Sequence, residues 1–142
     1  MTTGFWDSSA LVPLCVQQKA SAEARRLTRL YKVVVWWATP VEMRSALERL
    51  LRIGELSPGQ HQAAERRVEL LRKSWREMQP GEALRAEAES LLSHFGLRSA
   101  DALQLAAAVM WTLRNPRGKS FISGDVQLLE AARRLGFHAI EM

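Results

Sequence analysis

The chain carries 15 acidic residues, and only three of them are aspartates: Asp7, Asp101 and Asp125. Each aspartate lies at or beside the start of a predicted helix. Asp7 and Asp125, together with Glu42, also follow predicted strands directly. Several carboxylates in one cleft repel one another unless a cation lies among them. Their hard oxygen ligands suit Mg²⁺ or Mn²⁺, and a metal held there could activate a water for attack on a phosphoryl group.

The same four acids can also be interpreted as helix caps. Aspartate is favoured at helix N-termini, where it accepts backbone hydrogen bonds and meets the positive end of the helix dipole. Glu42 follows Thr39 by three residues, which is the spacing of a capping box with Pro40 in the first turn. Asp101 lies in the first turn of an apolar, alanine-rich helix, where an unpaired buried carboxylate is costly. Taken singly, each acid is more often a cap, so the two interpretations stay open unless the four converge.

Short apolar segments alternate with helical patterns along the chain and must position these acids. Residues 33–38 are continuously apolar and β-branched or aromatic, which is typical of a strand covered on both faces. The expected strands are 4–6, 33–38, 75–79 (at an edge), 120–123 and 138–140. Helical spacing follows Ser8 and Ser9, with Pro13 expected in or near the first turn. The remaining expected helices are about 18–31, 39–53, 58–73, 82–95, 99–113 and 126–135.

This alternation predicts an α/β protein with a parallel sheet and helices on both faces. Such sheets bind ligands at the carboxyl ends of their strands, which is where Asp7, Glu42 and Asp125 lie. Asp101 joins them if its helix packs beside the first strand. The length of 142 residues fits one domain, residues 1–142.

Composition limits the remaining possibilities. The net charge is +5 and only four of the 20 cations are lysines, so a polyanionic partner is plausible, although arginine bias alone gives the same numbers. Cys15 is the only cysteine and lies in an apolar run, so we expect a buried thiol and a reducing compartment. No segment resembles a signal peptide or a membrane span, and we therefore expect a cytoplasmic protein.

The four acids lie in four longer motifs: F-W-D-S-S-A-L at the start, T-P-V-E-M-R-S-A-L around Glu42, L-R-S-A-D-A-L-Q-L-A-A-A, and F-I-S-G-D-V-Q-L-L-E-A-A-R-R-L-G. These motifs resemble those of PIN-domain proteins, and specifically the VapC-type toxin ribonucleases. They occur in the order and spacing of that family and cover essentially the whole chain.

The resemblance implies a PIN-like fold, a parallel five-stranded sheet sandwiched by helices. It also implies an endoribonuclease dependent on Mg²⁺ or Mn²⁺, whose acidic pocket is Asp7, Glu42, Asp101 and Asp125. Ser8, Arg98 and Ser123 match positions that are often polar or basic near the family's site and are carried over as candidate substrate-binding residues. A homodimer and a cognate antitoxin protein are the partners implied.

In the expected mechanism, Asp7 and Asp101 are the principal metal ligands, while Glu42 and Asp125 orient waters or a second ion. Candidates for contacts with the RNA backbone are Arg25, Arg26, Arg44 and Arg98, although each alone also fits a solvated basic face. The alternative is a catalytically silent PIN-fold module that binds RNA or protein.

Two segments depart from the family pattern, the bulky Trp36-Trp37-Ala38 and residues 75–79, where Trp75 could belong to a partner surface.

Overall fold

The computed structural model describes residues 1–142, and its strands form a single sheet. The strands are β1 (Thr2–Trp6), β2 (Tyr31–Trp36), β3 (Arg76–Met78), β4 (Ser120–Ser123) and β5 (His138–Glu141). All neighbouring strands are parallel, in the order β3–β2–β1–β4–β5. The chain therefore runs outward from β1 to β3, then returns to the other side of β1 and runs outward again through β4 and β5. The direction reverses between β1 and β4, and a ligand site is expected at the carboxyl ends of strands at such a point.

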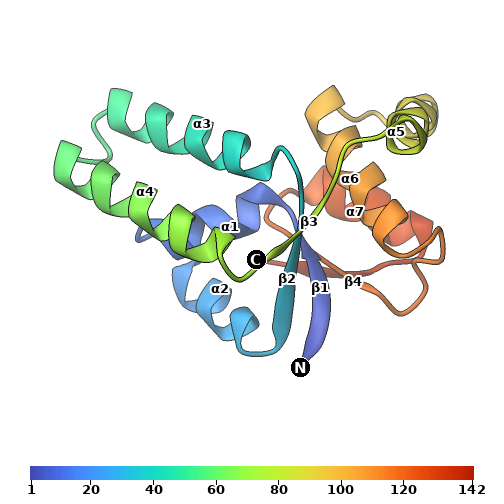
Figure 1. The fold of residues 1–142 in the computed structure, drawn as a ribbon, viewed down its shortest axis with the longest axis horizontal. Coiled ribbons are helices and arrows are strands. Elements are labelled where there is room, and N and C mark those ends of the chain that lie inside the picture. Colours follow the sequence, from blue (N-terminus) through green and yellow to red (C-terminus); the bar gives the residue numbers. More distant parts are fainter.

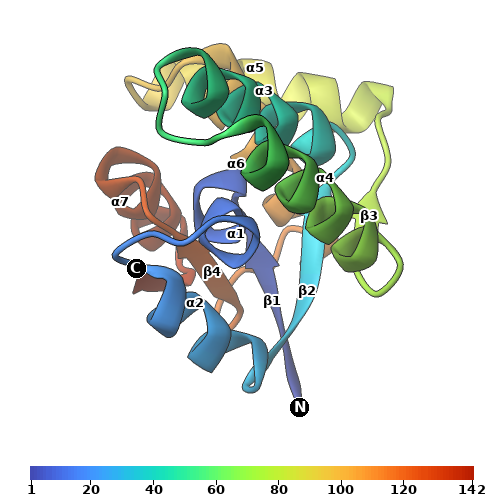
Figure 2. The ribbon, with the colours of Figure 1, turned by 90° about the vertical axis from the view of Figure 1, so that its left-hand side faces the viewer.

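Seven helices cover the sheet in two layers. They are α1 (Ser8–Cys15), α2 (Ser21–Thr28), α3 (Thr39–Arg52), α4 (Pro58–Arg72), α5 (Glu82–His94), α6 (Ser99–Trp111) and α7 (Val126–Leu135). Helices α1–α4 lie on one side of the strands and α5–α7 on the other (Figure 1). Figure 2 looks onto the α1–α4 side, where α3 and α4 run next to each other as a pair. The five-stranded parallel sheet sandwiched by helices is thus confirmed.

Alternate residues of the strands supply two hydrophobic cores. Phe5 and Phe121 pack with α5, α6 and α7, whereas their neighbours Trp6 and Ile122 pack with α1–α4. Val35 lies in the second core between Val34 and Trp36 in the first, so the continuous apolar run at this position does reflect a strand covered on both faces.

Four local expectations are wrong. Strand β2 begins at Tyr31 and ends at Trp36, so the predicted helix 18–31 is shortened to α2 and Trp37 lies beyond the strand, half exposed. Pro13 lies in the second turn of α1, because that helix already begins at Ser8. Thr39 is the first residue of α3 and does not cap it, and no capping box forms with Glu42. Ala38 precedes the helix with helical backbone angles, so the chain enters α3 without the extended residue that a side-chain cap requires.

The structure also shows where Trp75 and Cys15, two side chains outside the acidic group, lie. Trp75 is only 8% exposed and belongs to the core beneath α3 and α4, so the expected partner surface at this residue is wrong. Cys15 is buried as expected, and burial raises the pKa of its thiol to about 11, which leaves it protonated and unreactive at neutral pH. None of the seven helices combines the length and apolar character needed to cross a bilayer.

Candidate active site

Asp7 is the most deeply placed carboxylate of the molecule. It follows β1 directly and is 3% exposed, and its backbone N–H extends the β1–β4 pairing by donating to the carbonyl of Ile122. Although Asp7 precedes α1, its side chain makes no capping hydrogen bond. Instead Oδ2 accepts from Ser9 Oγ at 2.5 Å and from Ser123 Oγ at 2.8 Å. The Asp7 carboxylate is therefore held at the carboxyl edge of the sheet by hydroxyl groups of two different elements.

Ser9 and Ser123 also join the ends of β1 and β4 to each other. Their hydroxyl oxygens are 3.3 Å apart, and Ser9 Oγ accepts from the backbone N–H of Gly124 at 2.9 Å. Ser123 Oγ accepts from the N–H of Asp125 at 2.9 Å. Because parallel strands bring Trp6 opposite Ile122, the next residues of both strands, Asp7 and Ser123, meet at this edge.

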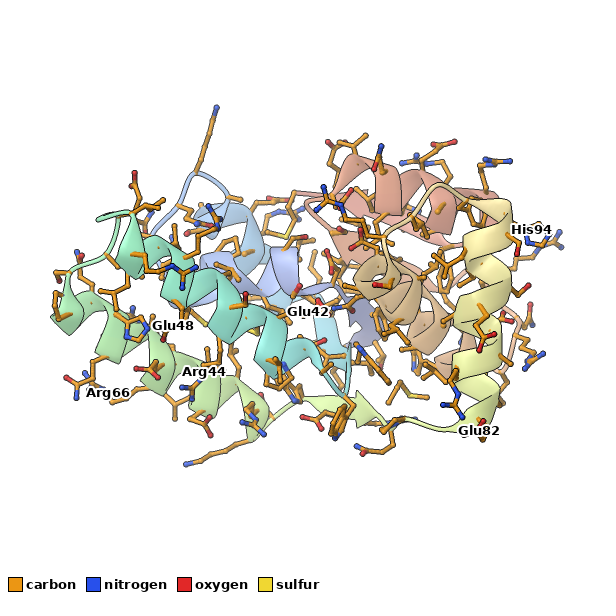
Figure 3. The ribbon with its side chains drawn as sticks, turned by 90° about the horizontal axis from the view of Figure 1, so that it is seen from above. Glu42, Arg44, Glu48, Arg66, Glu82 and His94 are labelled. Atoms are coloured by element: carbon orange, nitrogen blue, oxygen red, sulfur yellow. The ribbon has the colours of Figure 1, made fainter.

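Glu42 approaches from the first turn of α3. Its Oε2 accepts from Ser8 Oγ at 3.1 Å, and Ser8 Oγ also lies 3.4 Å from Asp7 Oδ1. The side-chain amide of Gln104 on α6 donates to both Glu42 oxygens, at 3.0 Å and 3.3 Å. Figure 3 shows Glu42 between the α3–α4 pair and the helices of the opposite layer, away from Arg44, Glu48 and Arg66. Glu42 thus faces the other acids.

Asp101 and Asp125 complete the group from the other layer. Asp101 is in the first turn of α6, as expected, and no side-chain cap forms at the start of that helix. Asp125 is the N-cap of α7 and its Oδ1 accepts from Leu128 N–H at 3.1 Å. The cap interpretation therefore holds for Asp125 alone, and its second carboxylate oxygen makes no such bond.

The four acids influence one another electrostatically. Burial raises the pKa of Asp7, and the bonds from Ser9 and Ser123 offset this only in part. Burial is also the main cause that raises the pKa of Glu42, with further increases from the charges of Asp7 and Asp101. The pKa of Asp101 is raised by burial and then by the charges of Asp125 and Asp7. The sequence motifs are thus brought together at one edge of the sheet.

This group of acids lacks a basic partner. None of the ion pairs in the structure includes any of the four. Arg98, which precedes α6, lowers the pKa of Asp101, but by less than the neighbouring acids raise it. Carboxylate oxygens are the ligands that Mg²⁺ and Mn²⁺ prefer, so the donor set fits a divalent ion.

Two residues close to these acids do not follow from the sequence motifs. Ser9 and Gln104 both bond directly to a site carboxylate, yet only Ser8, Arg98 and Ser123 were expected beside the acids. The adjacent serines Ser8 and Ser9 were a signal, since a helix turns consecutive side chains to different sides. Gln104 was signalled by its distance of three residues from Asp101, which places both on one face of α6.

The arginines proposed for RNA binding have different surroundings. Arg44 pairs with Glu65 and Glu69 of α4, and Arg26 pairs with Glu23. Helix α2, which carries Arg25 and Arg26, lies beside the opposite ends of the strands from the acids (Figure 1). Arg98 is exposed and adjoins Asp101, and it is the candidate that lies beside the site.

A second group of possible metal ligands lies between α3 and α4. Both ring nitrogens of His61 contact carboxylates, Glu48 at 2.7 Å and Glu65 at 3.1 Å, and the His61 side chain is 12% exposed. Glu65 also pairs with Arg44. Because these groups already satisfy one another, we interpret them as an ion-pair network that joins the two helices.

Comparison with solved structures identifies proteins of similar fold. The structure of PAE2754 from Pyrobaculum aerophilum has a TM-score of 0.69 at 19% identity, with 99% of this chain and 89% of that chain covered. FitAcB from Neisseria gonorrhoeae has a TM-score of 0.68 at 15% identity and 96% coverage of both chains. A toxin–antitoxin complex from Klebsiella pneumoniae has a TM-score of 0.65 at 13% identity and 88% coverage of both. The comparison with curated proteins gives no match.

Family membership follows from the sequence rather than from these distant structures. The PIN domain model matches residues 5–134, a span that includes all four acids and nearly the whole chain. This match over nearly the whole chain, together with the acids at the carboxyl edge of the sheet, leads to one conclusion: the chain belongs to the PIN domain family.

Proposed function

We propose that this chain is a metal-dependent endoribonuclease that hydrolyses RNA phosphodiesters, and that it is the VapC-type toxin of a type II toxin–antitoxin pair. The observation that carries the proposal is the cluster of Asp7, Glu42, Asp101 and Asp125 at one edge of the sheet without a basic partner. PIN domains are generally nucleases, which supports a hydrolase. In this proposal residues 1–142 act as one PIN-like domain.

The four acids have distinct roles in the proposal. Asp7 and Asp101 are the principal ligands of Mg²⁺ or Mn²⁺, and the increase that the charge of Asp7 causes in the pKa of Asp101 supports this pairing. Glu42 and Asp125 border them and orient waters or a second ion. A bound ion supplies Lewis acidity, which makes a water more acidic and offsets charge on the phosphodiester.

The neighbouring polar residues hold these acids or meet the substrate. Ser8 and Ser123 were expected to bind substrate, but their hydroxyls already contact Glu42 and Asp7, which favours a role in orienting those carboxylates. Arg98 is exposed at the start of α6, which supports a role in contacting a phosphate of the RNA. Contacts of that kind give affinity without sequence specificity.

An antitoxin and a second copy of the chain are the proposed protein partners. One of the similar structures is a toxin–antitoxin complex, which supports the antitoxin as a partner. Co-expression with the protein encoded by the adjacent reading frame tests this part, since growth inhibition by the chain alone should then be relieved.

The decisive experiment measures RNA cleavage by the purified chain with Mg²⁺, with Mn²⁺ and with EDTA. Cleavage is expected with either ion and not with EDTA. Asp101→Asn, which keeps the shape of the side chain but removes its charge, should lower the rate by at least about 100-fold, as for other groups that act directly on the reaction. Glu130→Gln on the exposed side of α7 is the matched control and should cleave like the wild type.

The same assay tests the alternative of a silent binding module. If the wild-type chain neither binds Mn²⁺ nor cleaves RNA, the nuclease proposal is wrong and the binding module is supported. Full activity of Asp101→Asn would contradict the role of Asp101 as a principal metal ligand while leaving the chain a nuclease.

A further inference from the structure

Gln104 connects the two helical layers through the candidate site. It lies on α6 one turn after Asp101 and is fully buried. Its Nε2 is 3.0 Å from Oε2 and 3.3 Å from Oε1 of Glu42, and 3.4 Å from Thr39 Oγ1. A single amide group therefore contacts the only two polar side chains that the first turn of α3 turns inward.

Packing alone does not account for a glutamine at this position. The buried neighbours on α6 are apolar, including Ala102, Leu105 and Ala106. The Oε1 of Gln104 is buried and has no hydrogen-bond partner, which is unfavourable for folding. An apolar side chain of the same volume would pack among these residues without leaving an unpaired acceptor.

The orientation of the amide is set by Glu42. A carboxylate accepts hydrogen bonds and cannot donate them when ionised, so the NH₂ group of Gln104 must face it. Ser8 Oγ contacts Oε2 of the same carboxylate from the other side. Donors on α1 and α6 thus fix both oxygens of a side chain that belongs to α3.

We propose that Gln104 is a positioning residue that holds the Glu42 carboxylate in the orientation needed at the divalent ion. The inference rests on the proposed function, because it assigns Glu42 a place beside that ion. Partners that orient metal-binding groups commonly change metal affinity or activity 10–100-fold when they are removed. Gln104 differs from the serines of the site in acting from the layer that carries Asp101.

Gln104→Met tests the proposal, because methionine keeps the length and volume but removes the donor and the unpaired acceptor. The Kd for Mn²⁺, measured by calorimetry, should rise about 10–100-fold, and kcat for RNA should fall in the same range. The KM for RNA should stay unchanged, because Gln104 is buried and cannot touch a substrate. The melting temperature without metal should change little, because the removal of the unpaired acceptor and the loss of the bonds to Glu42 act in opposite directions. Leu105→Met, also fully buried and next on α6, is the matched control and should leave all four quantities unchanged.

A double-mutant cycle separates positioning from general support of the fold. In a Glu42→Ala background, Gln104→Met should cause no further change in Mn²⁺ affinity or kcat, because the residue acts through Glu42. Losses that add in full, or an unchanged Mn²⁺ Kd in the single variant, would overturn the inference. A wild-type chain that binds Mn²⁺ but cleaves no RNA contradicts the proposed nuclease, whereas the Mn²⁺ titrations still decide the role of Gln104.

Discussion

Three serine hydroxyls surround two carboxylates at the edge of the sheet, and they are not equivalent. Ser9 and Ser123 contact the same oxygen of Asp7, at 2.5 Å and 2.8 Å. Ser8 is farther from Asp7 and closer to Glu42, at 3.4 Å and 3.1 Å. Ser9 also accepts from Gly124 N–H, so it links the start of α1 to the turn before α7. We therefore expect Ser9 to matter more for the site than Ser8.

Ser9→Ala should weaken Mn²⁺ binding and RNA cleavage by about 10-fold or more, because Asp7 loses its closest donor. It should also lower stability by about 1 kcal/mol, since the N–H of Gly124 loses its acceptor. Ser8→Ala should have the smaller effect on both quantities. Calorimetry with Mn²⁺ and urea unfolding measure the two effects, and Ser45→Ala on the exposed face of α3 is the control. The reverse order of Ser8 and Ser9 would show that the hydroxyls do not act through Asp7.

Which of the acids are caps could not be decided from local sequence. Only Asp125 makes the bond that an N-cap makes, whereas Asp7 occupies an N-cap position with its side chain turned elsewhere. The choice depends on partners such as Ser123 and Gln104, which lie more than 60 residues away from the acids that they contact. Sequence spacing predicts that a carboxylate is near a helix start, but not where it points.

At the scale of elements, hydrophobic periodicity predicted which strands and helices form, but it did not predict where they end. The run at 33–38 predicted β2, but the parallel register pairs Tyr31 with Thr2 and so starts the strand two residues earlier. The signals Thr39 and Pro40 placed the start of α3 correctly, but not its cap. Tertiary contacts decide both cases, because strand ends and side-chain partners depend on neighbouring elements that local patterns do not specify.

Helix α6 shows how small side chains support the site. Ala106, Ala107 and Ala108 are completely buried, and α6 contacts both α5 and the sheet. Their small side chains let the helix lie close against the sheet, and all three belong to the core on that side. The same helix carries Asp101 and Gln104, so its position sets the separation of two site residues from Asp7 and Glu42.

Ala106→Leu should therefore destabilise the protein by about 1–3 kcal/mol, because a larger side chain does not fit a filled core without shifting the helix. Metal affinity should fall as well, since Asp101 moves with the helix. Ala100→Leu places the same residue at an exposed position of α6 and should change the free energy of unfolding by less than about 0.5 kcal/mol. Urea unfolding monitored by tryptophan fluorescence compares the two, and equal effects would mean that α6 is not closely packed.

At the scale of the whole molecule, charge is distributed unevenly. The chain carries five more cations than acids, yet the edge between β1 and β4 gathers four acids without an ion pair. Residues from positions 7 to 125 meet there only because the sheet order places β4 beside β1. A sequence can show each acid, but the convergence depends on this order, which local patterns do not determine. The expectation that the four acids share one pocket came from the family resemblance.

The acid cluster should make stability depend on pH in opposite ways with and without metal. Folding raises the pKa values of Asp7, Glu42 and Asp101 above their values in the unfolded chain, which are about 4. At pH values above about 4, the native state therefore binds more protons than the unfolded state. Stability without metal therefore falls as pH rises above about 4 and increases again as pH is lowered toward that value. Mn²⁺ binds the charged carboxylates, so its Kd should rise as the pH falls. At a fixed Mn²⁺ concentration of 100 times the Kd at pH 7, the stabilisation should be about 2.7 kcal/mol at pH 7 and smaller at pH 5.

Urea unfolding at pH 5, 6 and 7, with EDTA or with Mn²⁺, measures both trends. Asp101→Asn is the comparison, because contributions of the histidines and of exposed acids are common to both proteins and cancel in the difference. The variant should have a smaller pH dependence in EDTA and should be more stable than the wild type at pH 7, by about 1 kcal/mol or less because Asp101 is only partly buried. It should also lose most of the stabilisation by Mn²⁺.

If wild type and variant showed the same pH dependence and the same response to Mn²⁺, Asp101 would belong to neither the charge cluster nor the metal site. The simpler interpretation of a charged residue in the first turn of α6 would then be sufficient.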